Sequence, residues 1–167
     1  MLRPGLVYFA YGCNMAPEVL AEIVGIELPP GWVTRLDDWR LAFNKGGEGA
    51  YGEGVVANLV QEEGCCTYGV VYRLPYEALA SLDAFEQAPK HYRRESFWVE
   101  PVGRCARQAA VGYVGQENWI VAAGRPDAGY LNSVIRGAVL NGLPVAYIDW
   151  LKALARGEPR DCHRSGA

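Results

Sequence analysis

The stretch YFAYGCNM, at residues 8–15, is the segment of this chain that says most about its fold. The apolar run at residues 6–11 predicts a buried strand, which stops at Gly12. A short polar turn follows, and the segment Pro17–Val24 has the apolar spacing of a helix with proline at its first position. We therefore expect a strand, a turn and a helix in direct succession.

Such a junction has two interpretations. It gathers unpaired backbone N–H groups and the positive end of a helix dipole at one point, which suits an anion such as a carboxylate. It is equally compatible with an ordinary core strand that ends in a tight turn.

Three motifs resemble one known family, γ-glutamylcyclotransferase-like (AIG2-like). Residues 8–15 match its YFAYGSNM signature, except for cysteine at position 13. The run SLDAFE at residues 81–86, with Tyr92 and Arg93 after it, is similar to the family's L-D-x-x-E and Tyr-Arg series. Tyr130 and the segments RGA at 136–138 and NGLP at 141–144 resemble a third series near the family's C-terminus. The matches keep the family's order over nearly the whole chain.

This resemblance implies a fold, an activity and a site. The family releases 5-oxoproline from γ-glutamyl compounds on a small mixed, barrel-like sheet flanked by helices. It uses the glutamate that matches Glu86 as its catalytic acid and base, and it needs no cofactor and no metal. The implied substrate-binding residues are Tyr8, Phe9, Ala10, Tyr11, Gly12, Cys13, Asn14 and Tyr130.

The remaining pattern agrees with an α+β fold, a mixed barrel-like sheet with short helices. Strand-like segments alternate irregularly with helical ones, which favours a mixed or antiparallel sheet with segregated helices. The expected strands are residues 6–11, one or two in 32–43, then 55–60, 68–74, 92–102 and 108–114; the expected helices are 17–24, 75–86, about 131–140 and 145–155. The glycine-rich segment 46–54 is predicted to be a loop, either a passive connector or a lid over the site.

Glu86 suits proton transfer for a reason independent of the family. It lies seven residues after Leu79, close to two helical turns, so it points to the same apolar side. Removal from water raises the pKa of a carboxyl group toward the range a general base needs. The alternative is a solvated carboxylate at a frayed helix end.

Cys13 leaves two further alternatives open. Cysteine is a weaker hydrogen-bonding residue than the family's serine, so substrate affinity or preference can differ. A thiol nucleophile at Cys13, with His91 as its base, is a second mechanism. A non-catalytic module that binds small ligands on the same fold is the competing function.

Composition restricts partners and location. The 167 residues carry a net charge of −3, and scattered positive charges argue against nucleic acid or membrane partners. We expect one domain at residues 1–157, a polar tail at 158–167, a small-molecule substrate, a possible homodimer and a cytoplasmic location. Five cysteines without a C-x-x-C pair indicate reduced thiols rather than a disulfide framework or zinc site.

Overall fold

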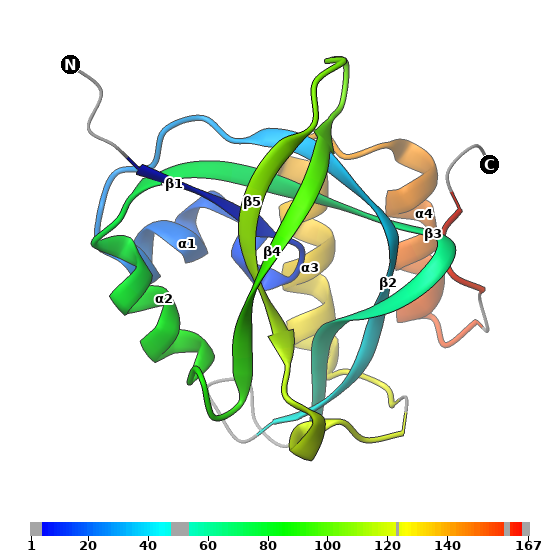
Figure 1. Ribbon diagram of the computed structural model, residues 1–167. Coiled ribbons are helices and arrows are strands. Elements are labelled where there is room, and N and C mark those ends of the chain that lie inside the picture. The colour runs from blue at the N-terminus through cyan, green and yellow to red at the C-terminus, as the bar shows by residue number, and fades with distance from the viewer. Residues whose placement is uncertain (1–4, 48–53, 123, 159–160, 165–167) are drawn as a thin grey trace.

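A closed five-stranded barrel with helices around it forms the computed structural model, which describes residues 5–47, 54–122, 124–158 and 161–164. Its strands follow the order β1-β3-β2-β4-β5 (Figure 1). Neighbouring strands are antiparallel, but β5 closes the barrel on β1 through a parallel bridge between Tyr8 and Val111. The strands are β1 (Gly5–Ala10), β2 (Trp32–Gly47), β3 (Gly54–Pro75), β4 (Tyr92–Pro101) and β5 (Gln108–Gly115). The predicted mixed, barrel-like α+β class is confirmed.

Helices cover the outside of this barrel. In the described residues they are α1 (Pro17–Val24), α2 (Ala78–Glu86), α3 (Ala128–Leu140) and α4 (Val145–Ala155), with 3₁₀ turns at Cys13–Met15 and Glu117–Trp119. The predicted bounds of α1 and α4 are correct. Gly25 ends α1 with a φ of 68°, a left-handed conformation that glycine adopts without steric cost. Pro75, predicted as the first residue of α2, is instead the last residue of β3.

The segment predicted to connect two strands is part of one long strand. Residues 61–67 belong to β3, which runs without a break for 22 residues. On the neighbouring strand β2, Asp37 pairs with Cys66, whereas Trp39, two residues later, pairs with Gln61. Asp38 sits between with a φ of 62° and accepts a hydrogen bond from the Gly64 backbone N–H at 2.9 Å. The polar residues that suggested a connector therefore form an irregular bulge between β2 and β3.

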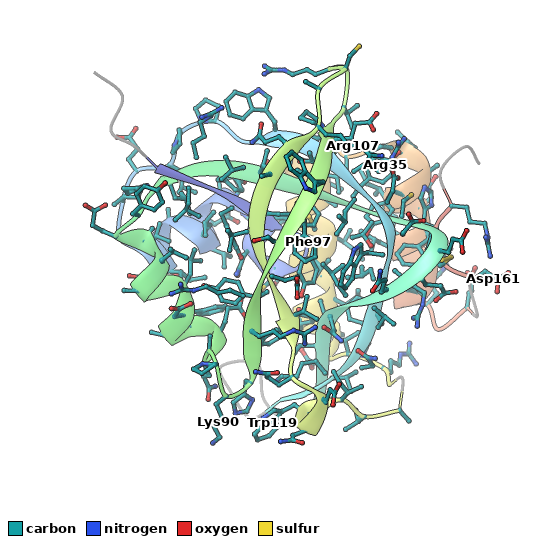
Figure 2. The ribbon with its side chains drawn as sticks, in the orientation of Figure 1. Arg35, Lys90, Phe97, Arg107, Trp119 and Asp161 are labelled. Carbon is teal, nitrogen blue, oxygen red and sulfur yellow. A yellow bond between two sulfur atoms is a disulfide. The ribbon has the colours of Figure 1, made fainter. Side chains whose placement is uncertain are left out.

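An aromatic cluster fills part of the barrel. The Phe97 ring, labelled in Figure 2, meets the rings of Trp39 and Phe9 edge-on, with centroids 5.2 and 6.1 Å away. Gly69 makes room for Phe9, because a Cβ there would lie 2.6 Å from the Phe9 ring. The cluster fixes β1 against β3 and β4, and so fixes where the turn after β1 emerges.

The C-terminal residues pack back onto the barrel. A disulfide joins Cys65 to Cys162, across 97 residues of chain, so the expectation that these thiols are reduced is wrong. The Cys66 backbone N–H also donates to the His163 carbonyl at 2.7 Å. Figure 1 shows this end of the chain beside α4 and β3. The boundary between a domain at 1–157 and a tail at 158–167 stays a prediction.

Candidate active site

The turn after β1 carries a buried asparagine that reaches Glu86. Within the turn, the Met15 N–H donates to the Gly12 carbonyl at 3.1 Å. The Asn14 side chain is 4% exposed, and its Nδ2 donates to the Tyr8 hydroxyl and to Glu86 Oε1, each at 3.0 Å. One amide thus joins β1 and the turn after it to the end of α2, which is 72 residues away in sequence.

Tight packing of α3 against the turn supports this arrangement. A Cβ on Gly137 would lie 2.9 Å from both the Ala16 nitrogen and the Met15 Cβ, so only glycine allows α3 to approach this closely. The Asn141 side chain, just past α3, donates to the Met15 carbonyl at 2.7 Å. The turn is therefore held from outside the barrel.

Glu86 has the altered acidity that proton transfer requires. It is the last residue of α2, and its side chain is partly buried. Removal from water raises its pKa from 4.5 to about 7, against the opposing effects of the Asn14 hydrogen bond and the charge of Lys45. Among the described residues, no lysine or arginine forms a salt bridge with Glu86. At neutral pH this carboxyl group can both take up and release a proton.

Neutral phenols surround the carboxylate. Burial, reinforced by the Glu86 charge, holds the pKa values of Tyr8, Tyr11 and Tyr92 well above 10. The Tyr92 hydroxyl donates to the Ala57 carbonyl at 2.7 Å. These tyrosines stay protonated at physiological pH, so they can supply hydrogen bonds without charge.

Tyr130 lies directly over the glycine of the turn. Asp127 caps α3 by accepting hydrogen bonds from the N–H groups of Gly129 and Tyr130, at 2.8 and 3.1 Å. The Tyr130 hydroxyl accepts the Ala57 N–H at 3.0 Å. A Cβ on Gly12 would lie 3.3 Å from that hydroxyl, so a larger residue at position 12 would crowd it.

Most of the residues predicted for the site come together here. Asn14 donates hydrogen bonds to Glu86 and Tyr8, and the charge of Glu86 acts on Tyr8 and Tyr11. Tyr130 acts electrostatically on Tyr11, and its hydroxyl lies next to Gly12.

Phe9 and Ala10 are placed differently, whereas Cys13 lies within the cluster, where it acts electrostatically on Tyr8 and Tyr11. The Phe9 side chain, fully buried, packs on Phe97 within the aromatic cluster. Ala10 is also buried and offers only a methyl group. The Cys13 thiol donates to Asn14 Oδ1 at 3.3 Å, while His91 Nδ1 lies 3.1 Å from Lys45 Nζ. The contiguous signature thus contributes side chains to more than one side of β1, as strand geometry requires.

Sequence reasoning missed two members of the cluster, Lys45 and Tyr92. Lys45 is 2% exposed, and its charge acts on Glu86. Lys45 follows the apolar segment LAF, residues 41–43, by two positions, and nothing in the neighbouring sequence marks it as buried. Tyr92 has only a motif signal in the sequence, as the tyrosine of the Tyr-Arg pair after α2.

A cleft lies along the loop that follows α2, and none of the residues that line it belongs to the predicted site. It has a volume of about 710 Å³. Figure 2 labels Lys90 and Trp119 at this end of the barrel. The lining residues are Pro89, Lys90, Arg93, Gln116, Glu117, Asn118 and Trp119.

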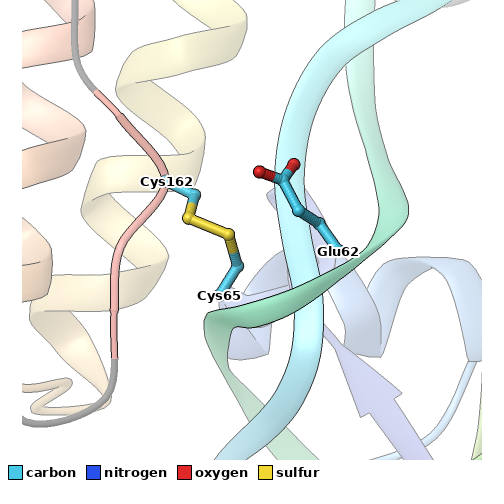
Figure 3. A group of neighbouring side chains, drawn as sticks. All are labelled: Glu62, Cys65 and Cys162. Carbon is cyan, nitrogen blue, oxygen red and sulfur yellow. A yellow bond between two sulfur atoms is a disulfide. The ribbon is translucent and has the colours of Figure 1, made fainter.

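One group in the described part of the chain has the spacing of metal ligands. Glu62, Cys65 and Cys162 place ligand atoms within 4.8 Å of one another (Figure 3). Both sulfurs are joined in the disulfide, and Glu62 forms a 2.6 Å ion pair with Arg40. The oxidised pair lacks the thiolates that a metal site requires.

Comparison with known proteins agrees with this geometry. The model of the AIG2-like family matches residues 67–151, slightly more than half of the chain. The chain belongs to the AIG2-like family. It is 29% identical over 160 residues to a γ-glutamylcyclotransferase of Homo sapiens, and the aligned region covers 93% of this chain and 80% of that protein. The protein of that name from Mus musculus is 28% identical over 157 residues.

The fold gives the same result. A solved structure of a γ-glutamyl cyclotransferase superposes with a TM-score of 0.79 at 26% identity, covering 98% of this chain and 93% of that one. Relatives and structural neighbours indicate an enzyme of the γ-glutamylcyclotransferase type. In the described residues, none of the helices combines the length and hydropathy needed to cross a bilayer.

Proposed function

We propose that this AIG2-like protein cyclises the γ-glutamyl group of a γ-glutamyl amine or amino acid to 5-oxoproline and releases the free amine. The observation that carries the proposal is the Asn14–Glu86 contact. It fixes a carboxyl group with a pKa of about 7 beside the turn that follows β1. The names of the relatives support the same reaction.

The reaction needs one group that takes up a proton and later returns it. Glu86 would remove a proton from the substrate's α-ammonium, so that the amine attacks its own γ-carbonyl carbon. The new C–N bond closes a five-membered ring and moves an electron pair to the carbonyl oxygen. The ring nitrogen still carries one proton too many and releases it to water. When the electron pair returns, the bond to the leaving amine breaks, protonated Glu86 gives the departing nitrogen one proton, and the free amine takes up a second proton from water. Atoms and charges balance without a protein nucleophile or cofactor.

The surrounding residues would hold the substrate in the shape that cyclisation requires. The backbone of Gly12, Cys13 and Asn14 would bind the glutamyl group, and Tyr8, Tyr11 and Tyr130 would enclose it; Phe9 and Ala10 would act by shaping the strand behind them. Asn14 would also position Glu86. Exclusion of water by the bound substrate would strengthen every such hydrogen bond.

Partner, assembly and location complete the proposal. The partner would be a small molecule, and a homodimer stays a possible assembly. The cytoplasmic location stays a prediction. The Cys65–Cys162 disulfide argues against it, because disulfides are rare in reducing compartments.

Incubation with a panel of γ-glutamyl amines and amino acids tests the function. Mass spectrometry would measure 5-oxoproline and the released amine. We expect the two products in equal amounts from at least one substrate, and a loss of at least about 100-fold in rate for Glu86→Gln. Tight binding of a γ-glutamyl compound without turnover would favour the alternative, a non-catalytic binding module.

A further inference from the structure

Lys45 is a buried cation that no role described above requires. It lies near the end of β2 and is 2% exposed. Among the described residues, it is the only lysine or arginine that is buried. Burial of an ammonium group is costly unless the charge has partners, so its surroundings need an explanation.

The contacts of the ammonium group account for part of its hydrogen-bonding capacity. Nζ donates to the Gly46 carbonyl at 2.6 Å and lies 3.1 Å from His91 Nδ1. It also lies 4.9 Å from the ring centroid of Tyr92 and 5.4 Å from that of Trp119. A lysine ammonium has three N–H donors. Counting only the described residues, the Gly46 carbonyl, the His91 ring nitrogen and two ring faces hold it in place, and one N–H remains for a further acceptor.

His91 and Trp119 make this position rigid. Their rings stack with centroids 3.7 Å apart, and the Trp119 indole N–H donates to the Lys90 carbonyl at 3.0 Å. His91 is 2% exposed. A fixed ammonium loses little conformational entropy when a ligand binds, which favours selective recognition over a flexible surface lysine.

Lys45 faces the proposed catalytic cluster without an ion pair to it. Its charge and that of Glu86 affect each other's pKa, yet in the described part of the chain Lys45 forms no salt bridge with any carboxylate. Tyr92, under the ammonium, donates to the Ala57 carbonyl, and the Ala57 N–H donates to Tyr130. Lys45 therefore lies at the margin of the same cluster that contains the turn.

We propose that Lys45 binds a carboxylate of the substrate and so selects γ-glutamyl compounds that carry one at that position. The inference rests on the proposed function. A γ-glutamyl amino acid has two such groups, the α-carboxylate of the glutamyl part and the carboxylate of the leaving amino acid. Either would complete the ammonium's hydrogen bonds and neutralise its charge.

The test compares three substrates in wild type and Lys45→Met. They are γ-glutamylalanine, its glutamyl α-carboxamide, and γ-glutamylethylamide, whose leaving amine has no carboxylate. We expect Lys45→Met to lower kcat/KM by about 10- to 100-fold for every substrate that retains the recognised carboxylate. The substrate that lacks it should be poor for wild type and unaffected by the substitution, which identifies the carboxylate involved.

Controls separate this role from effects on folding or on Glu86. Lys152→Met removes an exposed lysine on α4 and should leave all three rates unchanged. Lys45→Gln provides a second, polar substitution, and thermal melting checks that each variant is folded. An equal loss on all three substrates would mean that Lys45 acts only through Glu86, and would overturn the proposal.

Binding of 5-oxoproline and 5-oxoprolinamide, measured by calorimetry, separates this inference from the proposed function. Each binds as a preformed ring, so no turnover is needed. If substrates are turned over but removal of either carboxylate has no effect on the rate, the function stands and the role of Lys45 is rejected. If 5-oxoproline binds more tightly than 5-oxoprolinamide only when Lys45 is present, and no substrate is turned over, the role of Lys45 stands and the function is rejected. Absence of both turnover and binding would reject both.

Discussion

Replacement of Glu86 by glutamine should stabilise the protein at neutral pH while it abolishes turnover. The substitution keeps the side-chain volume, and the glutamine Oε1 can still accept the hydrogen bond from Asn14. What it removes is a charge in a poorly solvated place. Most substitutions destabilise a protein, so a gain in stability here would be informative.

The magnitude follows from the pKa. In the folded protein the pKa of Glu86 rises from 4.5 to about 7, and each pKa unit corresponds to about 1.4 kcal/mol. Between these two values the folded state holds the proton more tightly than the unfolded state. The free energy of unfolding of wild type therefore falls as pH rises through that window, and the full cost is present above pH 7. Because the side chain is partly open to solvent, we expect a cost of about 2–3 kcal/mol.

Urea denaturation of wild type and Glu86→Gln between pH 4.5 and 8 would measure this cost. The variant should match wild type near pH 4.5 and exceed it by about 2–3 kcal/mol at pH 8. Glu22→Gln, at an exposed position on α1, should show no such growing difference. A gap between Glu86→Gln and wild type that does not change with pH would refute the reasoning.

Three further predictions concern the residues around this carboxyl group and the C-terminal disulfide. Cys13→Ser should retain or improve the rate of 5-oxoproline formation, because a hydroxyl is the stronger donor to Asn14; complete inactivity would support a thiol nucleophile. Asn14→Ala removes a hydrogen bond that lowers the pKa of Glu86, so the acidic limb of the kcat/KM profile should move up by about one pH unit; an unmoved limb would contradict that contact. Cys162→Ser opens the bridge to Cys65, and non-reducing urea denaturation should show a loss of about 2–4 kcal/mol; activity should persist, and unchanged stability would mean that the bridge does not form in solution.

Local signals made the bounds of α1 and α4 and the site glutamate predictable. The limits of α1 follow from Pro17 and Gly25, which act on their immediate neighbours. The interior position of Glu86 follows from its spacing to Leu79 on a regular helix, and its raised pKa agrees with that reasoning. Such features need little knowledge of the rest of the fold.

Features that depend on distant contacts could not be read from the sequence. The continuity of β3 across residues 61–67 depends on Asp38 in another strand. The Cys65–Cys162 disulfide closes a separation of 97 residues. Lys45 has no local sign of burial, because the rings that cover it come from β4 and the turn at Glu117–Trp119.

Turnover in ¹⁸O-labelled water tests the central claim, an intramolecular cyclisation, most directly. A γ-glutamyl substrate identified in the panel would be converted by wild type, and the products analysed by mass spectrometry. The mechanism predicts 5-oxoproline without ¹⁸O, because the ring closes with the substrate's own amine and water adds no atom. Glutamate with ¹⁸O in its γ-carboxylate as the main product would show hydrolysis and contradict the account.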